Sequence, residues 1–309
     1  MTEHKYAVYG VSLISDIPFD FPPAASADHD RPHVRFAQAG DALDRTEAGS
    51  DEWFVCRQQE DGSLYVRWSG LYEFVVDPSG TLVRYRALRD GEPAILQNFL
   101  FGQTLSFALI RQNVEPVHAA VVDVGGHAIA LLGDCTYGKS TLAASLLQAG
   151  CRLLSDDLLV VHECGGMLLA RAGAGRIKLL PDAARAVLDD STAGVPLLPG
   201  ADKRVFRLDR RLVQPDDVPL HAIVVLPAPD ERAVCTRIDI DRITGAEVFR
   251  ELVKNTFVRY VDEARRLHQN FACNAHLASA VAGYRLRYPP GIERLPDVSG
   301  AITEYFRQN

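Results

Sequence analysis

The sequence predicts an α/β fold with a smaller β-rich N-terminal domain, residues 1–90, followed by a larger domain, residues 91–309, on a mixed β-sheet. Short strands separated by glycine-containing turns dominate the first part, whereas strands alternate with helices in the second. With 309 residues, of which 47% are hydrophobic and 24% charged, the chain is long enough for two hydrophobic cores.

The first part has the pattern of an antiparallel meander. Alternating polar and apolar residues begin near Lys5, and turn sequences occur at Asp61-Gly62 and at Asp77-Pro78-Ser79-Gly80. A proline-rich loop is expected at 17–23. The expected strands are 5–14, 53–56, 64–68, 72–76 and 82–85.

The hydrophobic period changes near Pro93, so we expect the domain boundary between Ala87 and Pro93. A mostly buried helix is predicted at 95–110, and an alternating α/β pattern follows it. The expected strands are 117–124, 127–132, 152–155, 222–226 and 233–240, and the expected helices are 140–149, 181–188, 246–254 and 263–281.

Two glycines, Gly125 and Gly126, form the entire link between the first two of these strands. A link of two residues can close an antiparallel hairpin, but a parallel crossover needs a dozen or more residues. The sheet of the larger domain is therefore expected to be mixed.

The strongest motif is the run GDCTYGKS at residues 133–140, which matches GxxxxGK[ST], the phosphate-binding P-loop. An apolar strand precedes it and an amphipathic helix follows, as a P-loop requires. Backbone N–H groups of the loop would bind the phosphates, Lys139 would reach the β- and γ-phosphates, and the Ser140 hydroxyl would bind Mg²⁺. The candidate nucleotide-binding residues are Gly133, Asp134, Cys135, Thr136, Tyr137, Gly138, Lys139, Ser140 and Thr141.

Two adjacent acids, Asp156 and Asp157, follow the strand expected at 152–155. Ligands of open α/β sheets bind at the carboxyl ends of the strands. One carboxylate there can accept the proton of an attacking hydroxyl while its neighbour holds Mg²⁺. The alternative is a solvated turn without a chemical role.

Four cations in short segments after loops, Arg176, Lys178, Lys203 and Arg204, are candidates for a positive wall around the triphosphate and the acceptor. The alternative for each is an ordinary surface cation. His118 lies in the strand before the glycine hairpin, where a packed or surface histidine is the alternative to a catalytic one.

The runs VHAAV (117–121), GDCTYGKS (133–140) and CRLLSDD (151–157) together resemble the catalytic domain of HPr kinase/phosphorylase. That family has a histidine-containing strand, a GDSGxGKS loop and an ADD strand end in this order. The resemblance implies a fold akin to phosphoenolpyruvate carboxykinase and the use of ATP and Mg²⁺. It also implies that Asp156 is the catalytic base, Asp157 a metal or positioning carboxylate, and His118 a group near the phosphates. Where the family has a metal-binding Glu, this chain has Ala170.

Over its whole length the chain is similar to HPr-kinase-like proteins of peptide-modification clusters. The similarity rests on residues 9–18, on RIKLLPDA at 176–183 and on DKRVFRL at 202–208. Some of these proteins are lasso-peptide kinases, which phosphorylate the C-terminal serine of a precursor peptide. This resemblance implies a peptide or a small protein as the phosphoryl acceptor.

Net charge, hydrophobicity and cysteine spacing argue against several classes of function. A net charge of −7 argues against broad nucleic-acid binding, and no apolar stretch is long enough to span a membrane. Six scattered cysteines without CxxC spacing favour a cytoplasmic location. The prediction is an ATP- and Mg²⁺-dependent phosphotransferase acting on a serine hydroxyl of a peptide or small protein.

Two alternatives to this function remain open. One is a kinase for a small molecule such as a sugar or free serine, and the other is a regulatory P-loop ATPase without an acceptor. Residues 1–90 are the candidate for acceptor recognition or for contacts in a homo-oligomer, because nothing in them resembles catalytic chemistry.

Overall fold

The chain forms two compact units. The first comprises Met1–Glu115 with Phe257–Arg266, and the second comprises Pro116–Thr256 with Leu267–Asn309. The boundary expected at residues 90 and 91 lies outside the described residues, and the helices that follow it belong to the first unit. The structure, a computed structural model, describes residues 3–20, 32–41, 43, 52–88, 93–188, 194–257 and 264–308.

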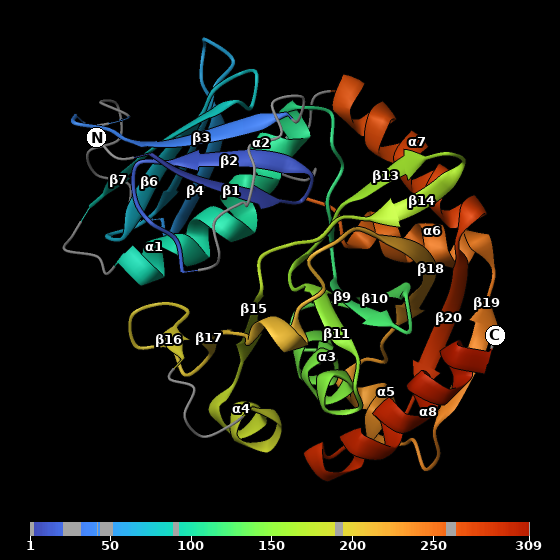
Figure 1. The fold of residues 1–309 in the computed structure, drawn as a ribbon. Helices are drawn as coiled ribbons and strands as arrows, with labels where there is room; N and C mark the ends of the chain where they lie inside the picture. The colour runs from blue at the N-terminus through green and yellow to red at the C-terminus, as the bar shows by residue number, and fades with distance from the viewer. Residues whose placement is uncertain are drawn as a thin grey trace. The chain divides into compact units, whose positions relative to one another are not determined.

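In the described part of the first unit, seven strands form one sheet in the order β1-β2-β3-β7-β6-β5-β4 (Figure 1). The strands predicted at 64–68 and 72–76 are confirmed, whereas the run 5–14 is a hairpin that turns at Tyr9 and Gly10, both at positive φ. The expected loop has no strand at 17–20 and otherwise lies outside the described residues. The strands are β1 His4–Val8, β2 Val11–Ser15, β3 His33–Gln38, β4 Phe54–Gln58, β5 Leu64–Trp68, β6 Tyr72–Val76 and β7 Leu82–Ala87.

The helix predicted at 95–110 is confirmed, with an irregular middle. It consists of α1 (Pro93–Phe99), a π-helical turn (Leu100–Thr104) and α2 (Leu105–Arg111). Aromatic packing joins it to the N-terminal sheet, because the ring of Phe99 lies 4.7 Å from that of Trp68. This packing explains why the segment belongs to the first unit.

The second unit is built on the expected mixed sheet (Figure 1). Strand β10 (His127–Leu132) runs parallel to β18 (Val218–Val225) and antiparallel to β9 (Ala120–Val124). Val124 pairs with His127 across the two glycines, so the predicted hairpin is confirmed. The other strands are β8 Val117–His118, β11 Arg152–Ser155, β12 Leu158–Leu159, β13 Val161–Cys164, β14 Met167–Ala170, β15 Arg176–Leu179, β16 Val195–Pro196, β17 Arg204–Arg207, β19 Asp239–Ile243 and β20 Ala282–Arg287.

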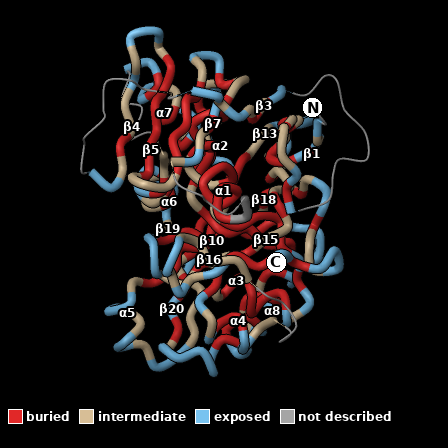
Figure 2. Tube along the Cα trace, turned by 90° about the vertical axis from the view of Figure 1, so that its left-hand side faces the viewer, coloured by how far each residue is buried: buried red, intermediate tan, exposed pale blue. Residues whose placement is uncertain are grey.

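Hydrophobic cores lie on both faces of this sheet, because successive side chains of a strand point to opposite faces. On one face Val122 packs in a cluster with Leu142 of α3 and Ile302 of α8. On the other face Val121 packs in a cluster with Leu277 of α7. Figure 2 shows the central strands and α3 as buried. The helices of this unit are α3 Lys139–Gln148, α4 Pro181–Val187, α5 Pro229–Ala233, α6 Gly245–Lys254, α7 Ala264–Ala280, which begins in the first unit, and α8 Leu295–Gln308.

The strand predicted at 233–240 is wrong over most of its length. The segment begins in the short helix α5, and the strand β19 starts only at Asp239. Pro229 at the start of α5 and the side chain of Glu231, which accepts a hydrogen bond from the Ala228 N–H, favour a helical turn there. Strand β20 and helix α8 are further elements that the sequence did not predict.

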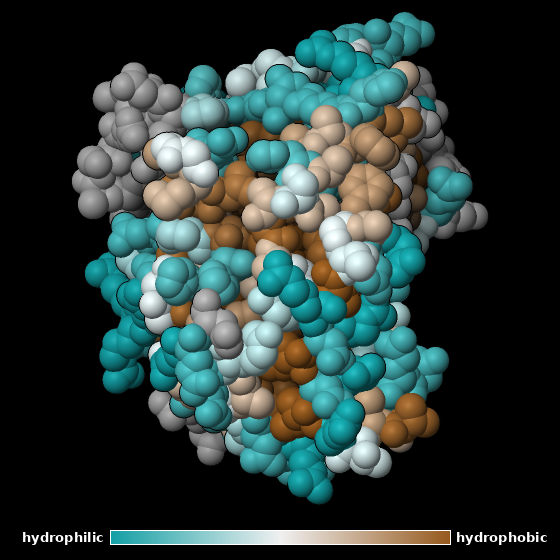
Figure 3. Space-filling view, turned by 90° about the vertical axis from the view of Figure 1, so that its right-hand side faces the viewer, coloured by the Kyte–Doolittle hydropathy of each residue, from teal (hydrophilic) through white to brown (hydrophobic). Residues whose placement is uncertain are grey.

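Helices α6 and α7 leave hydrophobic side chains at the surface. Leu267 and Phe271 of α7 are 49% and 60% exposed, and the Phe271 ring lies 4.9 Å from that of Phe249 in α6. Figure 3 shows hydrophobic surface on the side of the molecule that carries these helices. Among the described residues, no helix combines the length and the hydrophobicity that crossing a bilayer requires.

Candidate active site

The loop 133–140 joins the end of β10 to the start of α3, as the motif predicts. Gly138 is the N-cap of α3 with φ +89°, a left-handed conformation that suits glycine. It has no side chain to cap the helix, so the first N–H groups of α3 are available to an anion. Asp134, Cys135 and Thr136 form the exposed outer part of the loop.

Lys139 is buried at the first position of α3. Its Nζ donates hydrogen bonds to the carbonyl oxygens of Gly133, at 2.6 Å, and Asp134, at 3.2 Å. Burial lowers the pKa of Lys139 from its usual value, against the opposing effect of nearby acids. The ammonium group is therefore held at the loop itself, where phosphate oxygens would compete with carbonyls for it.

Ser140 lies next to the first carboxylate of the acidic pair. Its hydroxyl donates a hydrogen bond to Oδ1 of Asp156 across 2.9 Å, and the N–H of Lys178 donates to Oδ2 across 2.9 Å. Burial first, and then the charge of Asp157, raise the pKa of Asp156 to about 6. A carboxyl group with such a pKa can accept and release a proton near neutral pH.

Asp157 lies in a turn between β11 and β12, with φ +82°. Its carboxylate forms an ion pair with Lys178. Burial by itself would raise the pKa of Asp157, but the charge of Lys178, joined at low pH by that of protonated His118, outweighs this effect and holds the pKa at about 2. Near neutral pH, Asp156 can therefore gain and lose a proton, whereas Asp157 stays ionised. The first suits a proton acceptor and the second a permanent anion.

His118 supports this turn from β8. Its Nδ1 lies 3.1 Å from the carbonyl oxygen of Asp157, which also accepts the N–H of Ala119 at 3.1 Å. Burial and the charge of Lys139 lower the pKa of His118 to about 4, so the imidazole is neutral at pH 7. The structure thus brings His118 to the acidic pair through the backbone of Asp157.

The four predicted cations do not all converge. Lys178 pairs with Asp157, and the charge of Lys203 acts on both Asp157 and Lys139. Arg204 instead lies opposite Leu179 across the β15–β17 pair and donates to the carbonyl oxygen of Gly194. Because directly paired residues share a face, Arg204 lies on the face opposite Lys178.

The same pairing identifies a cation that the sequence reading missed. Arg207 pairs with Arg176, and Val205 pairs with Lys178, so Arg176, Arg207 and Lys178 share one face. Charged and apolar residues alternate in β15, but not in β17, and an alternating pattern does not by itself set the register between two strands.

Arg232 and Tyr288 are two further neighbours of the loop that the sequence reading missed. A Cβ atom added to Gly138 would lie 3.2 Å from Nη1 of Arg232 and 3.8 Å from the Tyr288 hydroxyl. Both residues are far from the loop in the sequence, and no local motif marks them.

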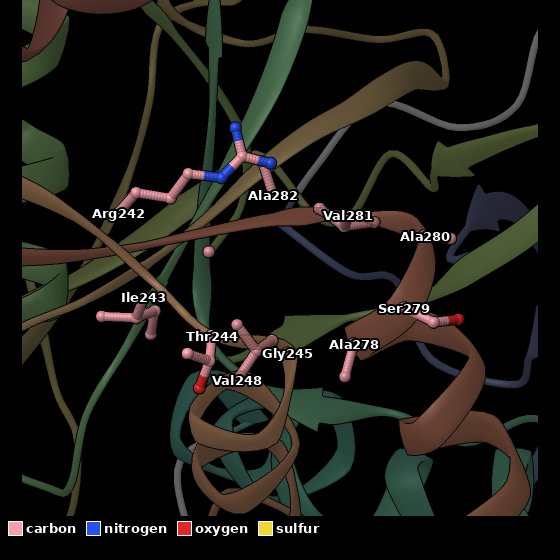
Figure 4. A pocket seen from close by; sticks show the side chains of 11 residues that line it. Arg242, Ile243, Thr244, Gly245, Val248, Ala278, Ser279, Ala280, Val281 and Ala282 are labelled. Atoms are coloured by element: carbon pink, nitrogen blue, oxygen red, sulfur yellow. The ribbon is translucent and has the colours of Figure 1, made fainter.

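A separate hollow of about 420 Å³ lies between the start of α6 and the end of α7. Figure 4 shows Thr244 and Val248 on one side of it and Ala278 on the other. Its lining is made mainly of small and apolar side chains and includes none of the predicted site residues.

Comparison with known proteins supports the resemblance seen in the motifs. No family model matches the chain. The HPr kinase/phosphorylase of Streptococcus salivarius is 28% identical over 158 residues, covering 45% of this chain and 50% of the relative. That of Clostridium beijerinckii is 30% identical over 76 residues, covering 25% of each chain. That of Prosthecochloris aestuarii is 38% identical over 59 residues, covering 19% of this chain and 17% of the relative.

The chain is thus related to HPr kinase/phosphorylases, although it spans at most half the length of these relatives. A solved structure, the HPr(Ser) kinase/phosphatase from Coxiella burnetii, aligns with a TM-score of 0.33 and 13% sequence identity. The alignment covers 62% of this chain and 88% of that one.

Proposed function

We propose that this protein is an ATP- and Mg²⁺-dependent kinase that transfers the γ-phosphate to a serine hydroxyl of a peptide or small protein. The contact between Ser140 and Asp156 carries this proposal, because it places a carboxyl group of raised pKa against the last residue of the P-loop motif. The relatives named HPr kinase/phosphorylase support phosphotransfer as the reaction class.

The residues present suit a nucleotide and a magnesium ion. The uncapped start of α3, with Lys139 behind it, provides N–H groups and a cation for phosphate oxygens. The Ser140 hydroxyl and one or two carboxylates are oxygen donors, which Mg²⁺ prefers, and Mg²⁺ usually completes its shell with water and substrate phosphates. When bound, the ion would neutralise charge on the transferring phosphoryl group.

In this proposal each side chain has one task. Asp156 accepts the proton of the attacking hydroxyl, and Asp157 remains charged and completes the metal site. Lys139 holds the phosphates, while Lys178 keeps Asp157 ionised and His118 positions its backbone. Lys203, Arg176 and Arg207 add positive charge on the side of the β15–β17 strands.

The acceptor is proposed from the relatives, whose name, HPr kinase/phosphorylase, refers to the protein HPr. Residues 1–90 would recognise the acceptor or form contacts in a homo-oligomer. We place the reaction in the cytoplasm, without a nucleic-acid or membrane partner.

Mass spectrometry of candidate acceptors after incubation with ATP and Mg²⁺ tests the proposal. The panel contains serine-ending precursor peptides, HPr, free serine and common sugars, each with wild type, Asp156→Asn and Asp182→Asn as a matched control on the exposed surface of α4. We expect one added HPO₃ group on a peptide or protein, lost in Asp156→Asn and kept in Asp182→Asn.

Each other outcome points to a different function. A phosphorylated sugar or free serine would indicate a small-molecule kinase. ATP hydrolysis without any phosphorylated acceptor would favour a regulatory ATPase. Absence of nucleotide binding would contradict the P-loop interpretation itself.

A further inference from the structure

Arg232 lies over the N-terminal end of α3. Its Nη1 is 3.2 Å from the position that a Cβ atom of Gly138 would occupy. The guanidinium group therefore borders the loop at Gly138, which has no side chain. Arg232 belongs to α5, the short helix that follows β18. Strand β18 is the parallel neighbour of β10, which leads into the loop.

The guanidinium group is held in place by Tyr288. Nη1 of Arg232 donates a hydrogen bond to the Tyr288 hydroxyl across 3.1 Å, and the guanidinium carbon lies 5.6 Å from the centre of the ring. Tyr288 itself is buried, directly after β20. A stacked and hydrogen-bonded arginine loses less conformational entropy when it binds a ligand than a freely rotating one.

Arg232 differs from two nearby arginines, Arg237 and Arg287, in its ion pairing. Arg237 and Arg287 each form ion pairs with Asp239, but among the described residues no carboxylate lies within ion-pair distance of Arg232. The adjacent Glu231 accepts the N–H of Ala228 instead. Because a helix N-terminus carries partial positive charge, a cation beside it is unfavourable unless an anion lies between them.

We propose that Arg232 contacts the phosphate chain of the nucleotide at the loop 133–140, as a second cation besides Lys139, and that Tyr288 positions it. This inference rests on the proposed function of the loop as a nucleotide site. A planar guanidinium group donates two parallel hydrogen bonds to phosphate oxygens, which a lysine ammonium cannot do.

Calorimetric titration of the full chain with ATP, inorganic triphosphate and adenosine tests this assignment. The variants are Arg232→Gln and Tyr288→Phe, with Arg237→Gln as a control that removes the same charge from an exposed residue of the same segment. We expect Arg232→Gln to weaken ATP and triphosphate binding about 10-fold to 100-fold, the usual effect of losing hydrogen bonds to a charged group. Adenosine binding and the behaviour of Arg237→Gln should not change.

Tyr288→Phe keeps the ring but removes the hydroxyl that accepts from Arg232, so it should weaken triphosphate binding by a smaller factor. If Arg232→Gln does not fold, as thermal melting would show, Arg232→Lys replaces it and should retain only part of the affinity.

Three results would overturn the assignment. Equal ATP affinity in Arg232→Gln and Arg237→Gln would leave Arg232 with a structural role only, while the nucleotide site itself would stand. A loss for ATP but not for triphosphate would move Arg232 to the nucleoside. Absence of ATP binding by the wild type would overturn the proposed function together with this inference.

Discussion

The Ser140 hydroxyl donates a hydrogen bond to Oδ1 of Asp156 across 2.9 Å, which joins the first turn of α3 to the end of β11. This single contact brings together two motifs that lie apart in the sequence. The same carboxyl group also accepts the N–H of Lys178, from β15. Three elements therefore position one side chain, which is what a proton acceptor in a phosphoryl-transfer site requires.

Variants of Ser140 test whether its hydroxyl binds Mg²⁺. In Ser140→Ala the hydroxyl is lost, so the magnesium concentration for half-maximal phosphotransfer should rise roughly tenfold, the effect of losing one hydrogen bond or ligand to a charged group. Ser140→Thr keeps the hydroxyl and should remain near wild type. Titration of the phosphotransfer rate with Mg²⁺ measures this, and equal curves for the two variants would contradict the role of the hydroxyl.

The acidic limb of the pH–rate profile should report Asp156. Because burial and Asp157 raise the pKa of Asp156 to about 6, kcat/KM should increase as pH rises through that value and the base loses its proton. His118, with its pKa lowered to about 4, remains neutral over this range. Rates measured from about pH 5 to about pH 8 test this.

Two variants should move that limb in opposite directions. Asp157→Asn removes a negative charge that raises the pKa of Asp156, so the limb should move to lower pH. Lys178→Met removes a positive charge that lowers it, so the limb should move to higher pH. A limb that stays in place in both variants would assign it to another group.

Gly283 should resist substitution because β20 and α6 approach each other closely there. A Cβ atom at Gly283 would lie 2.0 Å from Cγ2 of Val248, a buried side chain of α6. Gly283→Ala should lower the free energy of unfolding by about 1–3 kcal/mol, the range for an overpacked core. Combining it with Val248→Ala should recover part of this loss, and urea unfolding of the single and double variants measures it.

Removing one partner of the buried ion pair between Arg266 and Glu115 should destabilise the first unit strongly. Both side chains are nearly buried, at 6% and 4% exposed, and Arg266 also donates to Asn113 at 3.2 Å. Glu115→Ala should cost about 3–5 kcal/mol of unfolding free energy, because it removes the carboxylate that compensates a buried charge.

A double variant distinguishes the destabilisation caused by one uncompensated buried charge from the net contribution of the ion pair to the free energy of unfolding. Glu115→Leu with Arg266→Met should recover most of the stability in urea unfolding. Arg185→Ala, which breaks an exposed pair with Asp182, should cost less than about 1 kcal/mol. A loss in Arg185→Ala as large as that in Glu115→Ala would contradict the argument from burial.

Much of the architecture can be predicted from the sequence, because short local patterns specify it. Gly125 and Gly126 leave no room for a crossover, and the structure has the hairpin there. The strands expected at 64–68 and 72–76 are separated from their neighbours by clear turn sequences, and the structure has strands at those residues. The missed β3 is different, because it lies parallel between β2 and β7, and no turn next to it indicates such partners.

The candidate site can be predicted only in part, because some of its neighbours depend on strand pairing and not on local patterns. Lys139, Ser140 and the acidic pair are marked by motifs, and the structure brings Ser140 to Asp156. The sequence predicts that Arg204 and Lys178 belong to one positive wall, but the β15–β17 register places them on opposite faces.

Local sequence is enough to predict the loop 133–140, its strand and helix, and the paired acids, because glycine conformations and hydrophobic periods depend on neighbouring residues. The fold sets which cations share a face with Lys178 and brings Arg232 to the border of Gly138. It also buries Asp156, which raises the pKa of that carboxyl group, and brings the charges of Lys178 and His118 to Asp157, which lower its pKa. Those relationships depend on strand register, on the removal of water and on packing between residues far apart in the chain, and no local pattern encodes them.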